Sequence, residues 1–225
     1  MKILDRVNNN QLTPVLKERF EKVEPATIGH HLHYGFMDPR VQSQLVNVKI
    51  VGTAFTVRTS VNDSTMVHKA VSLAEPGDVL IIDRTGDQKH ACVGEMVAYA
   101  AKARKLAGII IDGPNTDIQA IREIGIPVFS TGLSPITTKL LGQSGEINTP
   151  VQCGGVTVHP GDLIVADDNG VLVLGQDLDY QAVLEKAEAS ENNEPRTKRL
   201  LDDGHTLSSL SKADSLIEQY FNTVK

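Results

Sequence analysis

Two short polar segments hold the residues that are best suited to chemistry. One is Asp112-Gly113-Pro114-Asn115-Thr116-Asp117, which follows the apolar run at residues 108–111. The other is Thr85-Gly86-Asp87-Gln88, which follows the apolar run at residues 79–82. Ligands of α/β proteins gather at the carboxyl ends of strands, where helix N-termini offer free backbone N–H groups. Both segments are therefore candidate binding loops.

Two carboxylates stand at the start of predicted helices. Asp117 precedes a helix predicted over residues 118–124, and Glu95 falls in the first turn of a helix predicted to begin near Cys92. Each has a local explanation, since an aspartate is a good N-cap and a helix dipole favours a carboxylate in the first turn. On local spacing alone, the N-cap is the favoured interpretation of Asp117. Taken together, two hard oxygen ligands after parallel-type strands suit Mg²⁺ or Mn²⁺ that keeps several of its waters.

The glycine in the other loop allows two interpretations of equal weight. Gly86 lets the backbone approach a ligand closely and present its amides to an anion. The same sequence is equally consistent with a simple tight turn.

Histidines form a second conspicuous group, His30-His31-Leu32-His33. No nearby cysteine completes a zinc spacing, so a structural or solvent-facing role is favoured over metal binding. His68 is predicted to lie on a helix near the same cleft, with an open role. The chain has no Gly-x-Ser-x-Gly, Walker or Gly-x-Gly-x-x-Gly motif, which argues against a serine hydrolase, a nucleotide triphosphatase and a dinucleotide enzyme.

The elements that must position these loops alternate between strands and helices. Helices are predicted over residues 11–23, 64–74 and 118–124, and strands over 48–58, 79–82, 109–111 and 126–129. Beyond Gly145, frequent Gly, Pro, Asp and Asn turns predict short antiparallel strands. From about residue 179 the chain is polar and helical, and residues 190–195 are predicted to break it into two helices. We expect a single domain over residues 1–225, with a core at about 15–175 and a helical extension at about 179–225.

Composition excludes several classes of protein. The 22 basic and 28 acidic residues give a net charge of −6 without any basic run, which disfavours direct nucleic-acid binding. No apolar stretch has the length of a signal peptide or a membrane span, so no membrane association and a cytoplasmic location are expected. Cys92 and Cys153 lie outside any Cys-x-x-Cys spacing and are expected to be buried thiols in a reducing compartment.

Longer stretches of the sequence resemble a known family. They begin at Gly94-Glu95-Met96-Val97-Ala98-Tyr99 and run on to Asp112-Gly113, and they recur at residues 66–70, 75–79, 125–129, 150–156 and 160–168. These stretches are similar to the regulator of ribonuclease activity A family, which includes the 4-hydroxy-4-methyl-2-oxoglutarate aldolases. The resemblance covers roughly residues 15 to 175.

The resemblance implies a compact, layered α/β/α-type fold related to the swivelling phosphohistidine domain, with helical N- and C-terminal segments. It implies homotrimers or homohexamers with active sites between subunits. Aldolase members are lyases that cleave a 4-hydroxy-2-oxo acid to pyruvate or decarboxylate oxaloacetate, through an enolate stabilised by a divalent metal, here Mg²⁺ or Mn²⁺.

The resemblance also implies roles for single residues. Asp117 takes the position that holds the metal, and Glu95 takes the catalytic position that holds the metal through water. Glu194 is the best match for a glutamate that a neighbouring subunit's C-terminal helix supplies to the metal. Both Glu95 and Asp117 are thus expected to be catalytic.

The substrate side of the pattern is altered. The loop of Gly86, Asp87 and Gln88 matches the one that holds the substrate carboxylate, and Thr116 stands where the family has an arginine that clamps the substrate. A threonine donates one hydrogen bond and carries no charge, so a bidentate clamp worth about 1.5–3 kcal/mol is missing. Four basic residues are possible substitutes: Arg84, Arg122, Lys69 and Lys139.

Two rival functions remain open. The founding name of the family suggests a non-enzymatic protein that inhibits an RNA-degrading endonuclease, and the acidic composition permits such contact. A methyltransferase is disfavoured, because the sequence has no glycine-rich nucleoside-binding loop.

Overall fold

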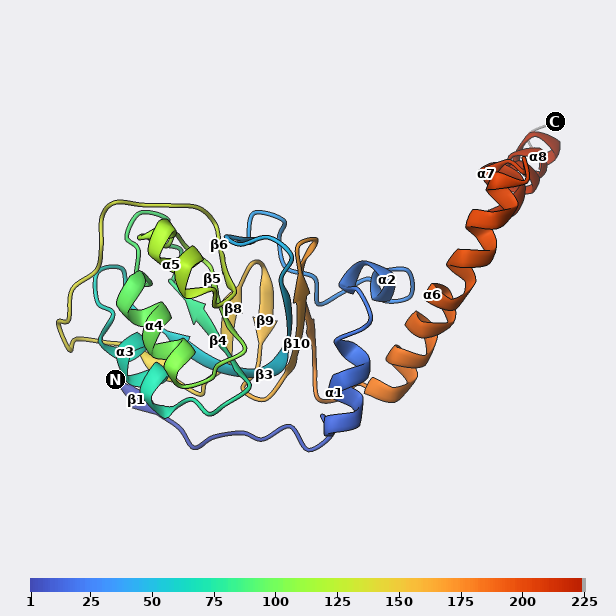
Figure 1. Ribbon diagram of the computed structural model, residues 1–225. Helices are drawn as coiled ribbons and strands as arrows, with labels where there is room; N and C mark the ends of the chain where they lie inside the picture. The colour runs from blue at the N-terminus through green and yellow to red at the C-terminus, as the bar shows by residue number, and fades with distance from the viewer. Residues whose placement is uncertain (224–225) are drawn as a thin grey trace.

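A computed structural model of the chain describes residues 1–223, which are built around one mixed β-sheet (Figure 1). The strands lie in the order β1 (Lys2–Ile3), β7 (Glu146–Ile147), β3 (Lys49–Arg58), β4 (Asp78–Asp83), β5 (Gly108–Ile111), β6 (Val128–Ser130) and β2 (Gln42–Ser43). The four strands β3 to β6 run parallel, and the hairpin of β10 (Leu163–Asp167) and β11 (Gly170–Leu174) joins β3 in antiparallel pairing. The carboxyl ends of β4 and β5 therefore meet at one edge of the sheet.

Each face of the sheet buries a different cluster, because side chains alternate along a strand. From β4, Leu80 and Ile82 pack with the helices α3 (Thr65–Leu73), α4 (Glu95–Ala103) and α5 (Ile118–Ile124). Val79 and Ile81 point to the opposite face, which a hairpin of β8 (Val151–Cys153) and β9 (Val156–Val158) covers. Four of the six β4 residues are apolar and all six are buried, as expected for a central parallel strand.

A third cluster closes the end of the sheet at the β10–β11 hairpin. The helices α1 (Pro14–Phe20) and α2 (Pro25–Gly29) and the first turns of α6 (Tyr180–Asp202) pack there. The rings of Phe20 and Tyr180 meet edge to face with centroids 6.3 Å apart. The predicted layered α/β fold with helical terminal segments is confirmed.

The C-terminal helix departs from the prediction. The expected break at residues 190–195 is wrong, because α6 is a single helix of 23 residues that contains Pro195. This helix projects from the body of the molecule (Figure 1). Proline removes only one N–H, which would have bonded to the Glu191 carbonyl, and water can satisfy that carbonyl on an exposed helix. The helix ends instead before Gly204, which has the left-handed φ of +93° common after helix ends. Two further helices, α7 (Leu207–Leu210) and α8 (Ala213–Thr223), follow at its tip.

None of the helices within residues 1–223, α6 included, combines the length and apolar character needed to cross a bilayer.

Candidate active site

A cavity of about 270 Å³ lies where the loops after β4 and β5 meet the start of α4. Its walls are the N-terminal part of α3, the segment 91–97, Thr116 with Asp117, and residues 137–140. The last of these belong to a segment, residues 137–143, that crosses the cavity's edge and is here called the strap. The site is thus assembled from four stretches that are far apart in the sequence.

Asp117 is the centre of the polar contacts in this cavity. Its Oδ2 accepts a hydrogen bond from the backbone N–H of Glu95 at 3.0 Å, and its Oδ1 accepts one from the Thr116 hydroxyl at 3.3 Å. Asp117 stands at the N-cap position of α5, yet its side chain makes no capping hydrogen bond to that helix. The interpretation of Asp117 as a local N-cap is therefore wrong, because the carboxylate caps the neighbouring helix α4 instead.

The backbone of Asp117 explains this direction. Its φ of +52° and ψ of +43° lie in the left-handed region, which aspartate tolerates better than most residues. An N-cap normally has an extended backbone that turns the side chain toward its own helix. The left-handed turn directs the carboxylate across to α4 instead.

Gly94 makes the contact between Asp117 and α4 possible. A Cβ atom on Gly94 would lie 2.4 Å from Asp117 Oδ2 and 2.8 Å from Thr116 Cγ2. The φ of Gly94 is −139°, an ordinary extended value, so the position needs glycine for space rather than for backbone freedom. Sequence reasoning missed this residue, because the contact joins two loops and leaves no local signal.

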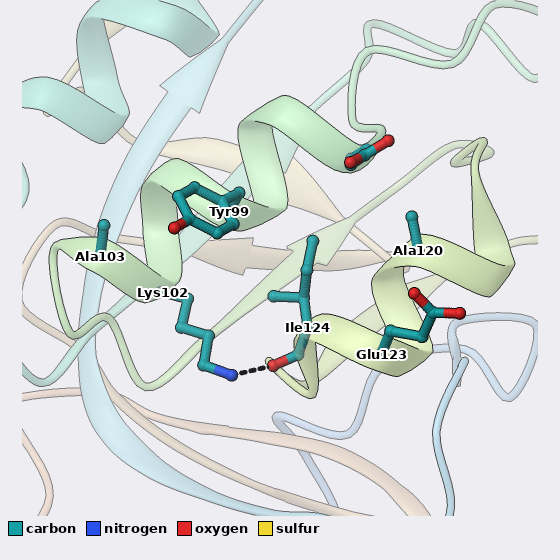
Figure 2. Close-up of a pocket in the computed structure, with 7 residues that line it drawn as sticks. Tyr99, Lys102, Ala103, Ala120, Glu123 and Ile124 are labelled. Carbon is teal, nitrogen blue, oxygen red and sulfur yellow. Dashed lines mark hydrogen bonds between the residues drawn. The ribbon is translucent and has the colours of Figure 1, made fainter.

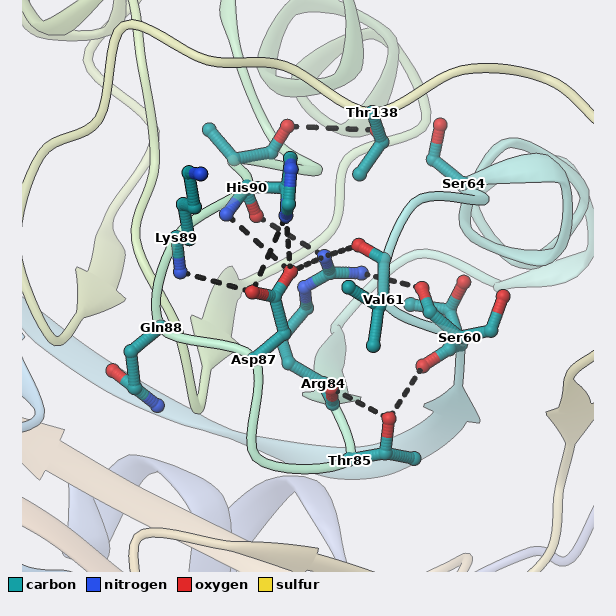
Figure 3. A network of polar contacts seen from close by, with 12 residues as sticks. Ser60, Val61, Ser64, Arg84, Thr85, Asp87, Gln88, Lys89, His90 and Thr138 are labelled. Atoms are coloured by element: carbon teal, nitrogen blue, oxygen red, sulfur yellow. Dashed lines mark hydrogen bonds and ion pairs between the residues drawn. The ribbon is translucent and has the colours of Figure 1, made fainter.

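The other candidate loop is held by a buried arginine (Figure 3). Arg84 is 0% exposed, and its guanidinium donates to the carbonyls of Val61 and His90 and to the Asp87 carboxylate at 2.8 Å. Asp87 also accepts hydrogen bonds from the backbone N–H groups of Lys89 and His90. Burial acts to raise the pKa of Asp87, but these hydrogen bonds and the charge of Arg84 hold it below its usual value. The Asp87 carboxylate is thus fully engaged within its own loop.

The predicted site residues fall into two groups. Glu95, Thr116 and Asp117 line the same cavity, whereas Gly86, Asp87 and Gln88 are absent from its walls. The side chain of Gln88 accepts from the Thr131 hydroxyl at 2.6 Å and donates to the Asp112 carbonyl at 3.3 Å. Gly86 has a φ of +85° and faces open space. A substrate-binding role for this loop stays a prediction. The cavity wall between β4 and α4 is formed by the later residues 91, 92 and 94–97 instead.

Glu194 lies on the projecting part of α6, where it pairs with Lys198 at 3.2 Å. Its predicted delivery to a neighbouring subunit stays a prediction. The histidines at 30, 31 and 33 are exposed, as expected, and His31 contacts the Ser190 hydroxyl at 2.8 Å.

The donor atoms at the cavity fit a hydrated divalent cation. In the part of the chain that the structure describes, no three His, Cys, Asp or Glu side chains lie close enough to enclose a metal. Glu95 and Asp117 are exposed residues that line the cavity, and their carboxylates can supply oxygen ligands. The Thr116 hydroxyl lies 3.3 Å from Asp117 Oδ1. Magnesium is commonly bound in this way, by one or two carboxylates and several waters.

A larger cavity of about 500 Å³ lies between α4 and α5 (Figure 2). Tyr99, Lys102, Glu123 and Ile124 line it, and the Lys102 ammonium is bonded to the Ile124 carbonyl. Of the predicted site residues it shares only Glu95. The smaller cavity, which holds three of them, is the better candidate for chemistry.

Comparisons with known proteins agree with this architecture. A model of the RraA-like family, described as Aldolase/RraA, matches residues 26–173. A Halalkalibacterium halodurans protein named "Putative 4-hydroxy-4-methyl-2-oxoglutarate aldolase" is 39% identical over 159 residues, which are 70% of this chain and 74% of that protein.

Solved structures extend the likeness to most of the chain. A protein from Pseudomonas syringae pv. tomato superposes with a TM-score of 0.78 at 24% identity, covering 93% of this chain and 98% of that one, and this likeness concerns the fold alone. Streptomyces coelicolor RraAS2, described as an unusual member of the RNase ES inhibitor RraA protein family, superposes with a TM-score of 0.73 at 27% identity. That match covers 87% of this chain and 98% of RraAS2.

Proposed function

On the premise that the chain belongs to the RraA-like family, whose model matches residues 26–173, we propose that it is a divalent-metal-dependent lyase that acts on 2-oxo acids. The observation that carries the proposal is that Glu95 and Asp117, from the starts of two helices, line one open cavity, where the Glu95 backbone N–H donates to the Asp117 carboxylate. Carboxylates gathered in this way at strand ends suit a cation and an anionic substrate together.

The two proposed reactions both require that negative charge on one oxygen atom be stabilised. Cleavage of a 4-hydroxy-2-oxo acid to pyruvate and decarboxylation of oxaloacetate both leave negative charge on the former keto oxygen. A bound Mg²⁺ or Mn²⁺ would supply a Lewis acid for that charge. Asp117 and Glu95 are the residues that would hold it.

The remaining tasks are assigned to this chain's own groups. Met96 and Val97, in the first turn of α4, line the cavity. Their N–H groups can bind a carboxylate, because the first amides of a helix have no partner within it. Glu95 orients a water that carries the proton to the product. We also expect a homotrimer or homohexamer in which Glu194 reaches a neighbouring cavity, and the projection of α6 from the body supports such an exchange.

The test is the substitution Asp117→Asn. Asparagine keeps an oxygen that can accept from the Glu95 N–H but loses the charge, so the fold is preserved while metal binding is weakened. Pyruvate release from oxaloacetate and from 4-hydroxy-4-methyl-2-oxoglutarate is measured with Mg²⁺ and Mn²⁺. We expect a loss of at least about 100-fold, or roughly 3 kcal/mol. Glu123→Gln, on the same helix α5 but outside the cavity, is the matched control and should retain full activity.

Wild-type protein that releases no pyruvate from either substrate would contradict the proposal, as would Asp117→Asn with full activity. The second candidate is inhibition of an RNA-degrading endonuclease, which the description of S. coelicolor RraAS2 favours. That function would persist in Asp117→Asn and in the presence of a chelator, so an endonuclease assay with the same variants separates the two.

A further inference from the structure

We propose that Asn115 positions the Asp117 carboxylate. The buried side-chain amide of Asn115, oriented by the Ser130 hydroxyl, fixes the peptide group between Thr116 and Asp117 and thereby sets the direction of the carboxylate. The inference rests on the proposed function, in which Asp117 holds the metal. It adds a positioning residue that does not itself line the cavity.

The direction of the Asp117 carboxylate depends on one peptide group. The Thr116 carbonyl belongs to the planar peptide that joins Thr116 to Asp117, so a change in the φ of Asp117 turns that peptide relative to the side chain. The φ of Asp117 is +52°, in a region that residues other than glycine sparsely populate. A residue keeps such a conformation where the surrounding contacts over-determine it. The contacts of Thr116 therefore decide where the carboxylate points.

Both peptide groups of Thr116 are held by hydrogen bonds. Asn115 Nδ2 donates to the Thr116 carbonyl at 3.1 Å. On the other side, the Thr116 N–H donates to the Val93 carbonyl at 3.0 Å. With the Thr116 carbonyl fixed, a change in the φ of Asp117 would swing its carboxylate away from the Glu95 N–H. Loss of the bond from Asn115 therefore frees the peptide to turn and releases the carboxylate.

The Ser130 hydroxyl decides which end of the amide meets Thr116. Its Oγ donates to Asn115 Oδ1 at 2.7 Å, and both residues are 0% exposed. This bond leaves Nδ2 to face the Thr116 carbonyl. The reversed amide would place Oδ1 where Nδ2 now lies, 3.1 Å from that carbonyl oxygen, so that two acceptors would meet without a hydrogen between them. Because the pair is buried, a lost partner leaves a polar group unsatisfied.

The pair is anchored to the sheet. Ser130 is the last residue of β6, and the turn after it is bonded to the backbone of Asn115. The Asn115 N–H donates to the Gly132 carbonyl at 3.0 Å, and the Asn115 carbonyl accepts from the Ser134 N–H at 2.9 Å. These backbone bonds fix the place of Asn115, and its side chain extends that order to the peptide before Asp117.

The experiment compares Ser130→Ala with Thr56→Val. Ser130→Ala removes the hydroxyl that orients the amide. Thr56→Val is the matched control, because Thr56 also donates a buried hydrogen bond of 2.7 Å, to the Thr149 carbonyl, and does not line the cavity. Two quantities are measured. One is hydrogen exchange at the Glu95 amide, whose partner is Asp117, and the other is the Kd of Mn²⁺, from the electron paramagnetic resonance of the free ion.

We expect Ser130→Ala to speed exchange at the Glu95 amide and to raise the Mn²⁺ Kd about 10- to 100-fold, the effect of losing a group that orients a metal ligand. Thr56→Val should lower the melting temperature by a similar amount and leave both quantities at their wild-type values. Ser130→Thr, which keeps the hydroxyl, should restore both. Asn115→Asp keeps the shape of the side chain but replaces the donating nitrogen with oxygen, and it should change both quantities at least as strongly as Ser130→Ala.

Glu95 exchange in Ser130→Ala and Asn115→Asp that matches Thr56→Val would overturn the inference, and so would an unchanged Kd in a protein that binds Mn²⁺. Faster Glu95 exchange in the variants, together with a wild-type protein that binds no Mn²⁺, would support the positioning of Asp117 and overturn the proposed metal-dependent reaction. The two failures are therefore distinguishable.

Discussion

The contact between Gly94 and Asp117 shows how a single missing atom defines the site. The Asp117 carboxylate can reach the first N–H of α4 only because residue 94 has no Cβ. The same carboxylate is the proposed metal ligand. Local stability and ligand binding therefore depend on one contact.

Gly94→Ala should reduce both properties. The added methyl must push the Asp117 carboxylate away, which costs about 1–3 kcal/mol as overpacking and moves the proposed ligand. Urea unfolding and pyruvate release measure the two effects. In an Asp117→Ala background the same substitution should cost less stability, because the closest atom is gone, and this cycle isolates the contact. An equal cost in both backgrounds would show that the contact does not matter.

Sequence reasoning at the residue scale succeeded where the signal was local. Glu95 and Asp117 were found because each stands where a strand-end loop enters a helix. Gly94 and the complete burial of Arg84 could not be found, because both depend on contacts between segments remote in sequence. The capping role of Asp117 was misassigned for the same reason, since its partner belongs to another helix.

At the scale of elements, the strap is the feature that pattern reasoning did not detect. Its residues form no helix and only isolated bridges, at Thr137 and Lys139, so they carry no periodicity. The four parallel strands, by contrast, lie within two residues of the predicted bounds, because β3 alternates in character and β4 to β6 are apolar runs between turns. The predicted break in α6 is wrong, because a proline on the exposed face of a helix can be accommodated, whereas a proline in a buried helix would break it.

Asp63→Asn should loosen the strap. Asparagine keeps one accepting oxygen but presents an NH₂ group to one of the strap amides, so a part-buried N–H loses its acceptor at a cost of about 1 kcal/mol. Hydrogen exchange at Leu141 and Gln143 should become faster. The amides of β10, which do not contact Asp63, serve as the internal control. Unchanged exchange at both strap amides would show that the strap is held by other contacts.

At the scale of the whole molecule, two buried carboxylates link stability to pH. Burial acts to raise the pKa of Asp63, but hydrogen bonds from Thr65, Gln143 and Leu141 hold it well below its ordinary value. Asp87 is shifted in the same direction. The folded protein therefore binds fewer protons than the unfolded chain in acid. Their contribution to stability is complete above the ordinary aspartate pKa of about 3.9 and is lost as pH falls through the folded values.

The contribution of these two groups to the free energy of unfolding, measured in urea, should accordingly be constant above about pH 5 and fall steeply below about pH 4. Asp87→Asn removes one of the two groups and should make the free energy of unfolding depend less steeply on pH below about pH 4. It should also lower stability at pH 7 by about 3–5 kcal/mol, because Arg84 is left buried without its counter-charge. If the free energy of unfolding of Asp87→Asn fell below pH 4 as steeply as that of the wild type, Asp87 would not contribute to the pH dependence.

The projecting α6 has a consequence for how the protein scatters X-rays. A compact chain of this length has a radius of gyration of about 17 Å, whereas 23 helical residues extend about 34 Å at 1.5 Å per residue. An isolated subunit should therefore give a pair-distance distribution with a long, weak tail from α6 and the two helices at its tip. If these helices pack against a neighbouring subunit, the tail merges into a larger and rounder particle. One solution scattering curve would thus report whether α6, which carries Glu194, is free in solution or packed against a neighbouring subunit.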